Sequence, residues 1–111
     1  MEQTVRQEKG VTVVALTGDV DLENSAQARQ VLLDRVNNAE PVVVDMSGVS
    51  YIDSSGVASL IEAFQAARGA GQYFALAALS DASLRVLKLA RLDEVFTLMD
   101  SVGEGIEEGA P

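Results

Sequence analysis

The residues best suited to chemistry stand together in the segment Asp53-Ser54-Ser55-Gly56, just before a stretch with helical periodicity. A helix leaves its first four backbone N–H groups without partners, and Asp and Ser side chains accept hydrogen bonds from them. Three acceptors in a row exceed what a cap requires, and Gly56 would let another molecule approach the backbone closely. On the residues alone, a plain helix cap is the favoured interpretation, and the alternative is a serine hydroxyl presented for modification.

Phosphorylation is the modification that such a position would tolerate. A phosphate on serine adds about −1.5 to −2 charges at pH 7. At a helix N-terminus, the unpaired N–H groups and the helix dipole favour a negative charge. A phosphoserine in this turn would therefore change what the surface binds, through bulk and through repulsion of a partner's acidic groups, without unfolding the domain.

Several kinds of catalysis are excluded because the chain has no His and no Cys. A Ser-His-Asp triad and a Cys/His zinc site are impossible, and the Gly-x-Ser-x-Gly, phosphate-loop and dinucleotide-binding motifs are absent. A Ser-Lys pair would need Lys9 or Lys88 beside Ser54, and no motif places them there. Asp19 and Asp21 form a carboxylate pair, but Mg²⁺ would need more ligands or substrate oxygens. We expect no enzymatic activity, no cofactor and no metal site.

The composition also limits the partners. The chain has 111 residues, which suits one domain, and its 17 acidic against 8 basic residues give a net charge of −9. This charge disfavours nucleic acid and anionic membranes; it serves either solubility or a partner with a basic face. No apolar run approaches the ~20 residues of a membrane span, and the first ten residues do not resemble a signal peptide. We therefore expect a cytoplasmic protein.

The strands that must position the turn are predicted by β-branched and apolar runs. A weakly alternating segment and a β-branched one are expected to form a hairpin that turns at residues 8–10. Two continuous apolar runs between breakers indicate central strands buried on both faces. The five predicted strands are residues 4–9, 11–17, 41–46, 73–79 and 93–98.

The helices are predicted by apolar residues at i, i+3 and i+4 spacing, with Asn24 or Ser25 as a candidate cap for the first. The predicted connections are a polar loop at 19–24 and a short link at 47–50, and residues 101–111 are expected to be a frayed helical turn or a disordered tail. The predicted helices are residues 26–37, 55–68 and 81–90.

The alternation of strands and helices after the hairpin predicts parallel strands with right-handed crossovers. The expected fold class is α/β, with a single mixed β-sheet, an N-terminal hairpin followed by parallel strands, and helices packed against it. The chain is expected to be one domain over residues 1–111, with a core from about residue 4 to 100 and a tail after it. Helical phase also predicts that Ser59 is exposed and contributes to a binding surface.

Three segments resemble the STAS domain family, the bacterial anti-sigma factor antagonists. Residues 42–57 (VVVDMSGVSYIDSSGV) look like the family signature, residues 16–21 (LTGDVD) resemble its loop after the second strand, and residues 87–96 (LKLARLDEVF) are similar to its third helix and last strand. The resemblance covers residues 4 to about 100 and implies a STAS-like fold. Ala58 departs from the Gly that many antagonists carry there, which leaves the identity of the partner open.

The resemblance also implies a function and a set of site residues. Ser54 is the implied phosphorylation site, and the implied partners are an anti-sigma factor that is a GHKL-type serine kinase and a PP2C-type phosphatase. The unphosphorylated protein would bind the anti-sigma factor and release a sigma factor. The alternative is a STAS accessory subunit of a lipid-trafficking ABC transporter. The expected partner-binding residues are Asp19, Asp21, Asp53, Ser54, Ser55, Gly56 and Ser59.

Overall fold

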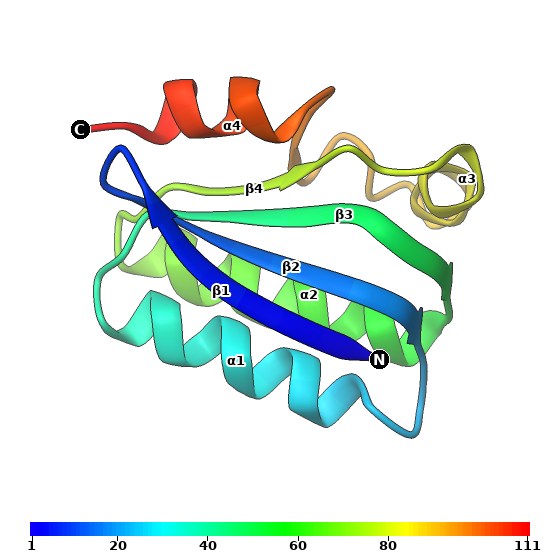
Figure 1. The fold of residues 1–111 in the computed structure, drawn as a ribbon. Coiled ribbons are helices and arrows are strands. Elements are labelled where there is room, and N and C mark those ends of the chain that lie inside the picture. The colour runs from blue at the N-terminus through cyan, green and yellow to red at the C-terminus, as the bar shows by residue number, and fades with distance from the viewer.

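Five strands form one mixed sheet in the order β1-β2-β3-β4-β5 in the computed structural model, which describes all 111 residues. The first two strands are antiparallel, and the other neighbouring strands run parallel, as predicted (Figure 1). Lys9 and Gly10 turn the hairpin with φ of +53° and +79°, the left-handed conformation that tight hairpin turns need. The strands are β1 (Glu2–Glu8), β2 (Val11–Val20), β3 (Val42–Ile52), β4 (Phe74–Ala77) and β5 (Thr97–Met99).

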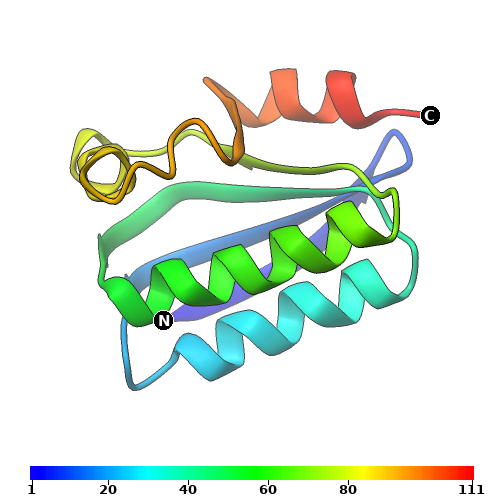
Figure 2. The same cartoon turned by 180° about the vertical axis from the view of Figure 1, so that it is seen from behind.

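The helices lie on both faces of the sheet. Figures 1 and 2 show α1 and α2 side by side under one face, α4 across the other face, and α3 near the end of the sheet where α2 begins. The helices are α1 (Ser25–Asn37), α2 (Ser54–Gly69), α3 (Asp81–Leu89) and α4 (Val102–Gly109). None of the four helices combines the length and the apolar character that a membrane crossing requires.

The core has two layers, because the first halves of β2 and β3 are buried on both faces. Alternate residues such as Val14 and Val44 point towards α1 and α2, where they meet Leu32 and Leu60. The intervening residues point the other way and form a second cluster with the buried Ile106 of α4, against which Val102 and Met99 also pack. This two-sided burial explains why the two strands are continuous apolar runs rather than alternating ones.

The predicted link at 47–50 is wrong, because β3 continues through it to Ile52. The register between β2 and β3 shifts between Ala15 and Thr17, which lets the two strands stay paired. Gly48 lies so close to Thr17 that an added Cβ would be 2.6 Å from its Cγ2. The pairing also places Asp19 inside β2, opposite Tyr51, rather than in a loop.

Two further differences concern the C-terminal part. Residues 93–96 form a turn instead of the start of the last strand, because Phe96 is buried against Phe64, with ring centroids 5.3 Å apart. The segment after residue 101 is helical, as one of the two alternatives had it, but it forms the eight-residue helix α4 rather than a frayed helical turn. Its glycines are contact points: a Cβ on Gly109 would lie 2.5 Å from the Tyr73 ring, and Tyr73 donates a hydrogen bond to the carbonyl of Gly105.

Candidate functional site

The turn between β3 and α2 lies beside the loop between β2 and α1, because parallel strands end at the same edge of a sheet. Asp53 joins the two segments through both oxygens of its carboxylate. Its Oδ1 accepts from the N–H of Gly56 at 3.0 Å, which makes Asp53 the cap of α2, and its Oδ2 accepts from the N–H of Leu22 at 3.1 Å. Asp53 therefore fixes the shape of the site, and each of its carboxylate oxygens accepts one hydrogen bond within the chain.

Gly56 serves internal packing rather than the approach of another molecule, which corrects the expectation from the sequence. The residue is buried, and an added Cβ would collide with the carbonyl oxygen of Val20 and lie 2.7 Å from Cγ1 of Ile52. The missing side chain thus lets the first turn of α2 rest on the end of β2.

Ser54 is the exposed hydroxyl of the turn. It is the first residue of α2, and its Oγ makes no hydrogen bond within the chain. In the first turn of α2, the N–H of Gly56 donates to the carboxylate of Asp53 and the N–H of Val57 donates to the carbonyl of Asp53. The backbone N–H groups of Ser54 and Ser55 have no acceptor within the chain. A free hydroxyl thus stands next to two free donors at a helix N-terminus, where a negative charge is favoured.

The two other serines of this region differ from Ser54. Ser55 is half-buried, and its carbonyl accepts a hydrogen bond from Ser59. The prediction that Ser59 is exposed is wrong: it is 5% exposed, and its Oγ lies 2.8 Å from the carbonyl of Ser25, the first residue of α1. Ser59 is small and polar, so it sits where α1 and α2 pack together, which a phase argument from larger apolar residues did not reveal.

The acidic residues have separate tasks. Asp19 is exposed at the end of β2, whereas the carboxylate of Asp21 accepts from the N–H of Glu23 and shapes the loop. Asn24 makes no side-chain cap for α1; its amide instead bridges the carbonyl of Asp19 and the N–H of Asp21. The structure therefore brings Asp21 and Asp53 into one hydrogen-bonded scaffold and leaves Asp19 facing solvent.

Two apolar side chains at this edge were missed by the sequence analysis. Leu22 is 77% exposed in the loop that is bonded to Asp53, and Tyr51, the second-last residue of β3, is 55% exposed. In the sequence, the presence of Leu22 in a segment rich in acidic residues could have indicated this exposed apolar side chain. Exposed apolar and aromatic residues beside a polar motif are typical of protein-binding surfaces.

The surface around Ser54 has no cavity for a small substrate. Three hollows occur on the molecule, and none is lined by a residue of the Asp53–Gly56 turn or of the β2–α1 loop. No group of three His, Cys, Asp or Glu side chains is placed to hold a metal ion. What the site offers chemically is the exposed hydroxyl of Ser54.

Comparison with known proteins identifies relatives of the whole chain. The STAS domain family model matches residues 2–105. The chain is similar to the anti-sigma-F factor antagonist RsfB of Mycobacterium tuberculosis, with 26% identity over 104 residues, 93% of this chain and 84% of RsfB.

Solved structures share the fold. An anti-sigma factor antagonist from Mycobacterium paratuberculosis has a TM-score of 0.90 at 24% identity, covering 99% of this chain and 94% of that one. The Bacillus cell fate determinant SpoIIAA in its phosphorylated form has a TM-score of 0.74 at 16% identity, covering 96% and 98%. Both likenesses bear out the expected α/β architecture.

Proposed function

The chain belongs to the STAS domain family, and we propose that it is an anti-sigma factor antagonist controlled by phosphorylation of Ser54. One observation carries this proposal: the Ser54 hydroxyl is exposed and unbonded, and it stands beside two unpaired N–H groups at the start of α2. The relatives named as antagonists support the binding role, and the phosphorylated form of SpoIIAA shows that a protein of this fold carries the modification.

The partner in this proposal is an anti-sigma factor that is also a GHKL-type serine kinase. The unphosphorylated chain binds it in the cytoplasm and releases a sigma factor, the kinase transfers phosphate from ATP to Ser54, and a PP2C-type phosphatase restores the hydroxyl. The net charge of −9 favours a partner with a basic surface, because complementary charge speeds encounter.

The surroundings of Ser54 explain how a phosphate would end binding. Leu22 and Tyr51 supply exposed apolar area that a partner would cover. Covering them would also remove water from Ser54, and a phosphate is costly to bury without a cationic partner. The exposed carboxylate of Asp19 adds negative charge at the same edge. Phosphorylation is therefore expected to weaken the complex while the fold survives.

The experiment mixes the chain with its candidate kinase and ATP, maps phosphate by mass spectrometry, and measures kinase affinity by calorimetry. Ser54→Ala should bind and escape phosphorylation, whereas the matched variant Ser55→Ala should still be phosphorylated. Ser54→Asp should bind at least about tenfold more weakly with an unchanged circular dichroism spectrum. Phosphate on Ser55 alone, no phosphate at all, or an unchanged affinity of Ser54→Asp would refute the proposal.

A pull-down with Ser54→Ala tests the choice of partner. The proposal expects a kinase of the GHKL type to co-purify. Recovery of the permease and ATPase of a lipid-trafficking ABC transporter instead would contradict it and favour a STAS accessory subunit.

A further inference from the structure

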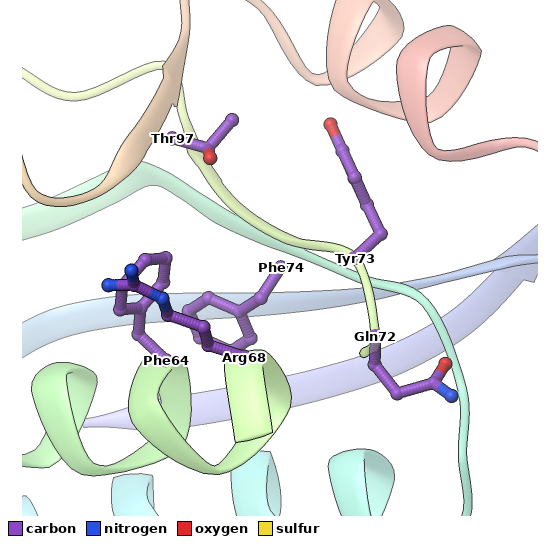
Figure 3. Close-up of a pocket in the computed structure, with 6 residues that line it drawn as sticks. All are labelled: Phe64, Arg68, Gln72, Tyr73, Phe74 and Thr97. Atoms are coloured by element: carbon purple, nitrogen blue, oxygen red, sulfur yellow. The ribbon is translucent and has the colours of Figure 1, made fainter. Parts of the chain in front are cut away.

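A pocket lies at the open edge of the sheet, between the second half of α2 and the start of β4. Its volume is about 280 Å³, the largest of the three hollows, and six residues line it (Figure 3). It is remote from the turn at Ser54, because Arg68 follows Ser54 by 14 residues along α2, or roughly 21 Å at 1.5 Å per residue. The lining residues are Phe64, Arg68, Gln72, Tyr73, Phe74 and Thr97.

The inner part of the pocket is aromatic. The rings of Phe64 and Phe74 stand edge to face with centroids 6.2 Å apart, and Phe74 is 3% exposed. In Figure 3 the guanidinium of Arg68 overlaps the ring of Phe64, and the ring of Phe74 lies beside the Arg68 side chain. Tyr73 adds only its ring, because its hydroxyl donates to the carbonyl of Gly105 in α4. These surfaces suit the apolar body of a small ligand.

The polar groups of the pocket are cationic or neutral, in a chain that is strongly acidic. The chain carries 17 acidic residues, yet none of the six lining residues is acidic. Arg68 is exposed and makes no ion pair. The side chains of Gln72 and Thr97 make no hydrogen bond within the chain, so both can donate to a ligand. This arrangement favours an anionic head group.

The sheet edge adds a backbone donor. The carbonyl of Tyr73 accepts from the N–H of Val42 in β3. Since a parallel strand directs its backbone groups alternately to its two neighbours, the N–H of Phe74 points to the opposite side, towards β5. Pairing between β4 and β5 begins only at Ala75, so β5 does not cover the edge beside Phe74. The N–H of Phe74 therefore faces the open edge at which the pocket lies.

We propose that this pocket binds a small organic acid, with one ring or a short carbon chain against Phe64 and Phe74 and the carboxylate facing Arg68. The volume lies just below the range of ordinary ligand pockets, which limits the ligand to about the size of phenylacetate. Arg68 pairs with the carboxylate, and Thr97 and the N–H of Phe74 are the neighbouring donors. The site is independent of the proposed role of Ser54, and binding needs no phosphate.

The test titrates phenylacetate, and separately its neutral analogue phenylacetamide, into the full chain and follows the backbone amides by NMR. Phenylacetate should give saturable shifts at Phe74 and Thr97, with a dissociation constant on the order of 1 mM or lower for a ligand of this size. Phenylacetamide should bind at least about tenfold more weakly, because it lacks the charge that pairs with Arg68.

Variants identify the cation. Arg68→Gln should weaken phenylacetate binding about tenfold, Arg68→Lys should retain part of it, and Arg85→Gln is the matched control, an exposed arginine on α3 that lines a different hollow. The spectrum of each variant reports that it is folded. Absence of saturable shifts, equal binding of the acid and the amide, or an unchanged affinity of Arg68→Gln would overturn the proposal.

Discussion

The hydrogen bonds of Asp53 predict two separable losses of stability. The variant Asp53→Ala removes the acceptor for Gly56 N–H at the start of α2 and the acceptor for Leu22 N–H in the neighbouring loop. The variant Asp53→Asn removes the negative charge but keeps a carbonyl oxygen for the cap, while its amide nitrogen cannot accept from Leu22. Comparison of the two variants therefore isolates the bond between the turn and the loop.

The expected magnitudes follow from exposure. Loss of a helix cap costs about 1 kcal/mol. The second bond, to the N–H of Leu22, is exposed, so water replaces part of it and about 0.5–1 kcal/mol is lost. Asp53→Ala should thus lower the free energy of unfolding by about 2 kcal/mol, and Asp53→Asn by about 1 kcal/mol or less. At about 4 °C per kcal/mol, the melting temperature of Asp53→Ala should fall by roughly 8 °C.

The assay is urea unfolding followed by circular dichroism, with NMR spectra of the loop amides as a local probe. Glu94→Ala is the control, because Glu94 is an exposed acid without a hydrogen bond or ion pair and its loss should change stability by less than about 0.5 kcal/mol. Asp53→Asn should shift the amide of Leu22 while the first turn of α2 stays unchanged. If Asp53→Ala costs no more than the control, or if Asp53→Asn costs as much as Asp53→Ala, the two-bond explanation is refuted.

Three further changes test other contacts. Ser59→Ala removes a buried hydroxyl that bonds to α1, so it should cost about 1 kcal/mol by urea unfolding, and no loss would contradict the assigned burial. Ile106→Ala should cost about 2–4 kcal/mol if α4 covers the sheet as described, whereas a loose tail would give a loss near zero. Burial, with the charge of Glu108, raises the pKa of Tyr73 above its ordinary value of about 10. The protonated Tyr73 therefore stabilises the fold below about pH 10, and this contribution is lost as the pH rises through the pKa of the folded state. Tyr73→Phe should therefore lose less stability than the unmodified chain between pH 9 and pH 11, with Tyr51→Phe as the control; equal losses would contradict the raised pKa.

Features set by local patterns were predictable from the sequence. The hairpin, the central strands and the capped start of α2 depend on β-branched runs, apolar periodicity and a Ser/Asp cluster, which are properties of neighbouring residues. The sequence predicted a helix start with Asp53, Ser54 and Ser55 as possible caps; in the structure Asp53 is the cap, and α2 begins at Ser54, one residue before the predicted start. The family resemblance added the order of elements over nearly the whole chain.

Features that depend on distant partners were not predictable. The strand β3 continues through Ser47 and Gly48 because it carries an extra residue there relative to β2, and no local pattern reveals that register shift. The glycines before the C-terminus indicate flexibility in isolation, yet Gly105 and Gly109 let α4 approach the sheet and Tyr73 closely. Ser59 has the polarity of a surface residue, and only the packing of α1 against α2 explains its burial.

The structural contacts of the turn are made by residues other than Ser54. Asp53 holds the helix start and the neighbouring loop, Gly56 permits the close contact with β2, and Ser59 joins the two helices. The side chain of Ser54 contributes no hydrogen bond to any of these, so its replacement by alanine or its phosphorylation breaks no hydrogen bond of the side chain. A serine with a structural bond would couple modification to unfolding. Under the proposed function, this separation of the hydroxyl from the scaffold would let phosphorylation change the binding surface while the domain stays folded.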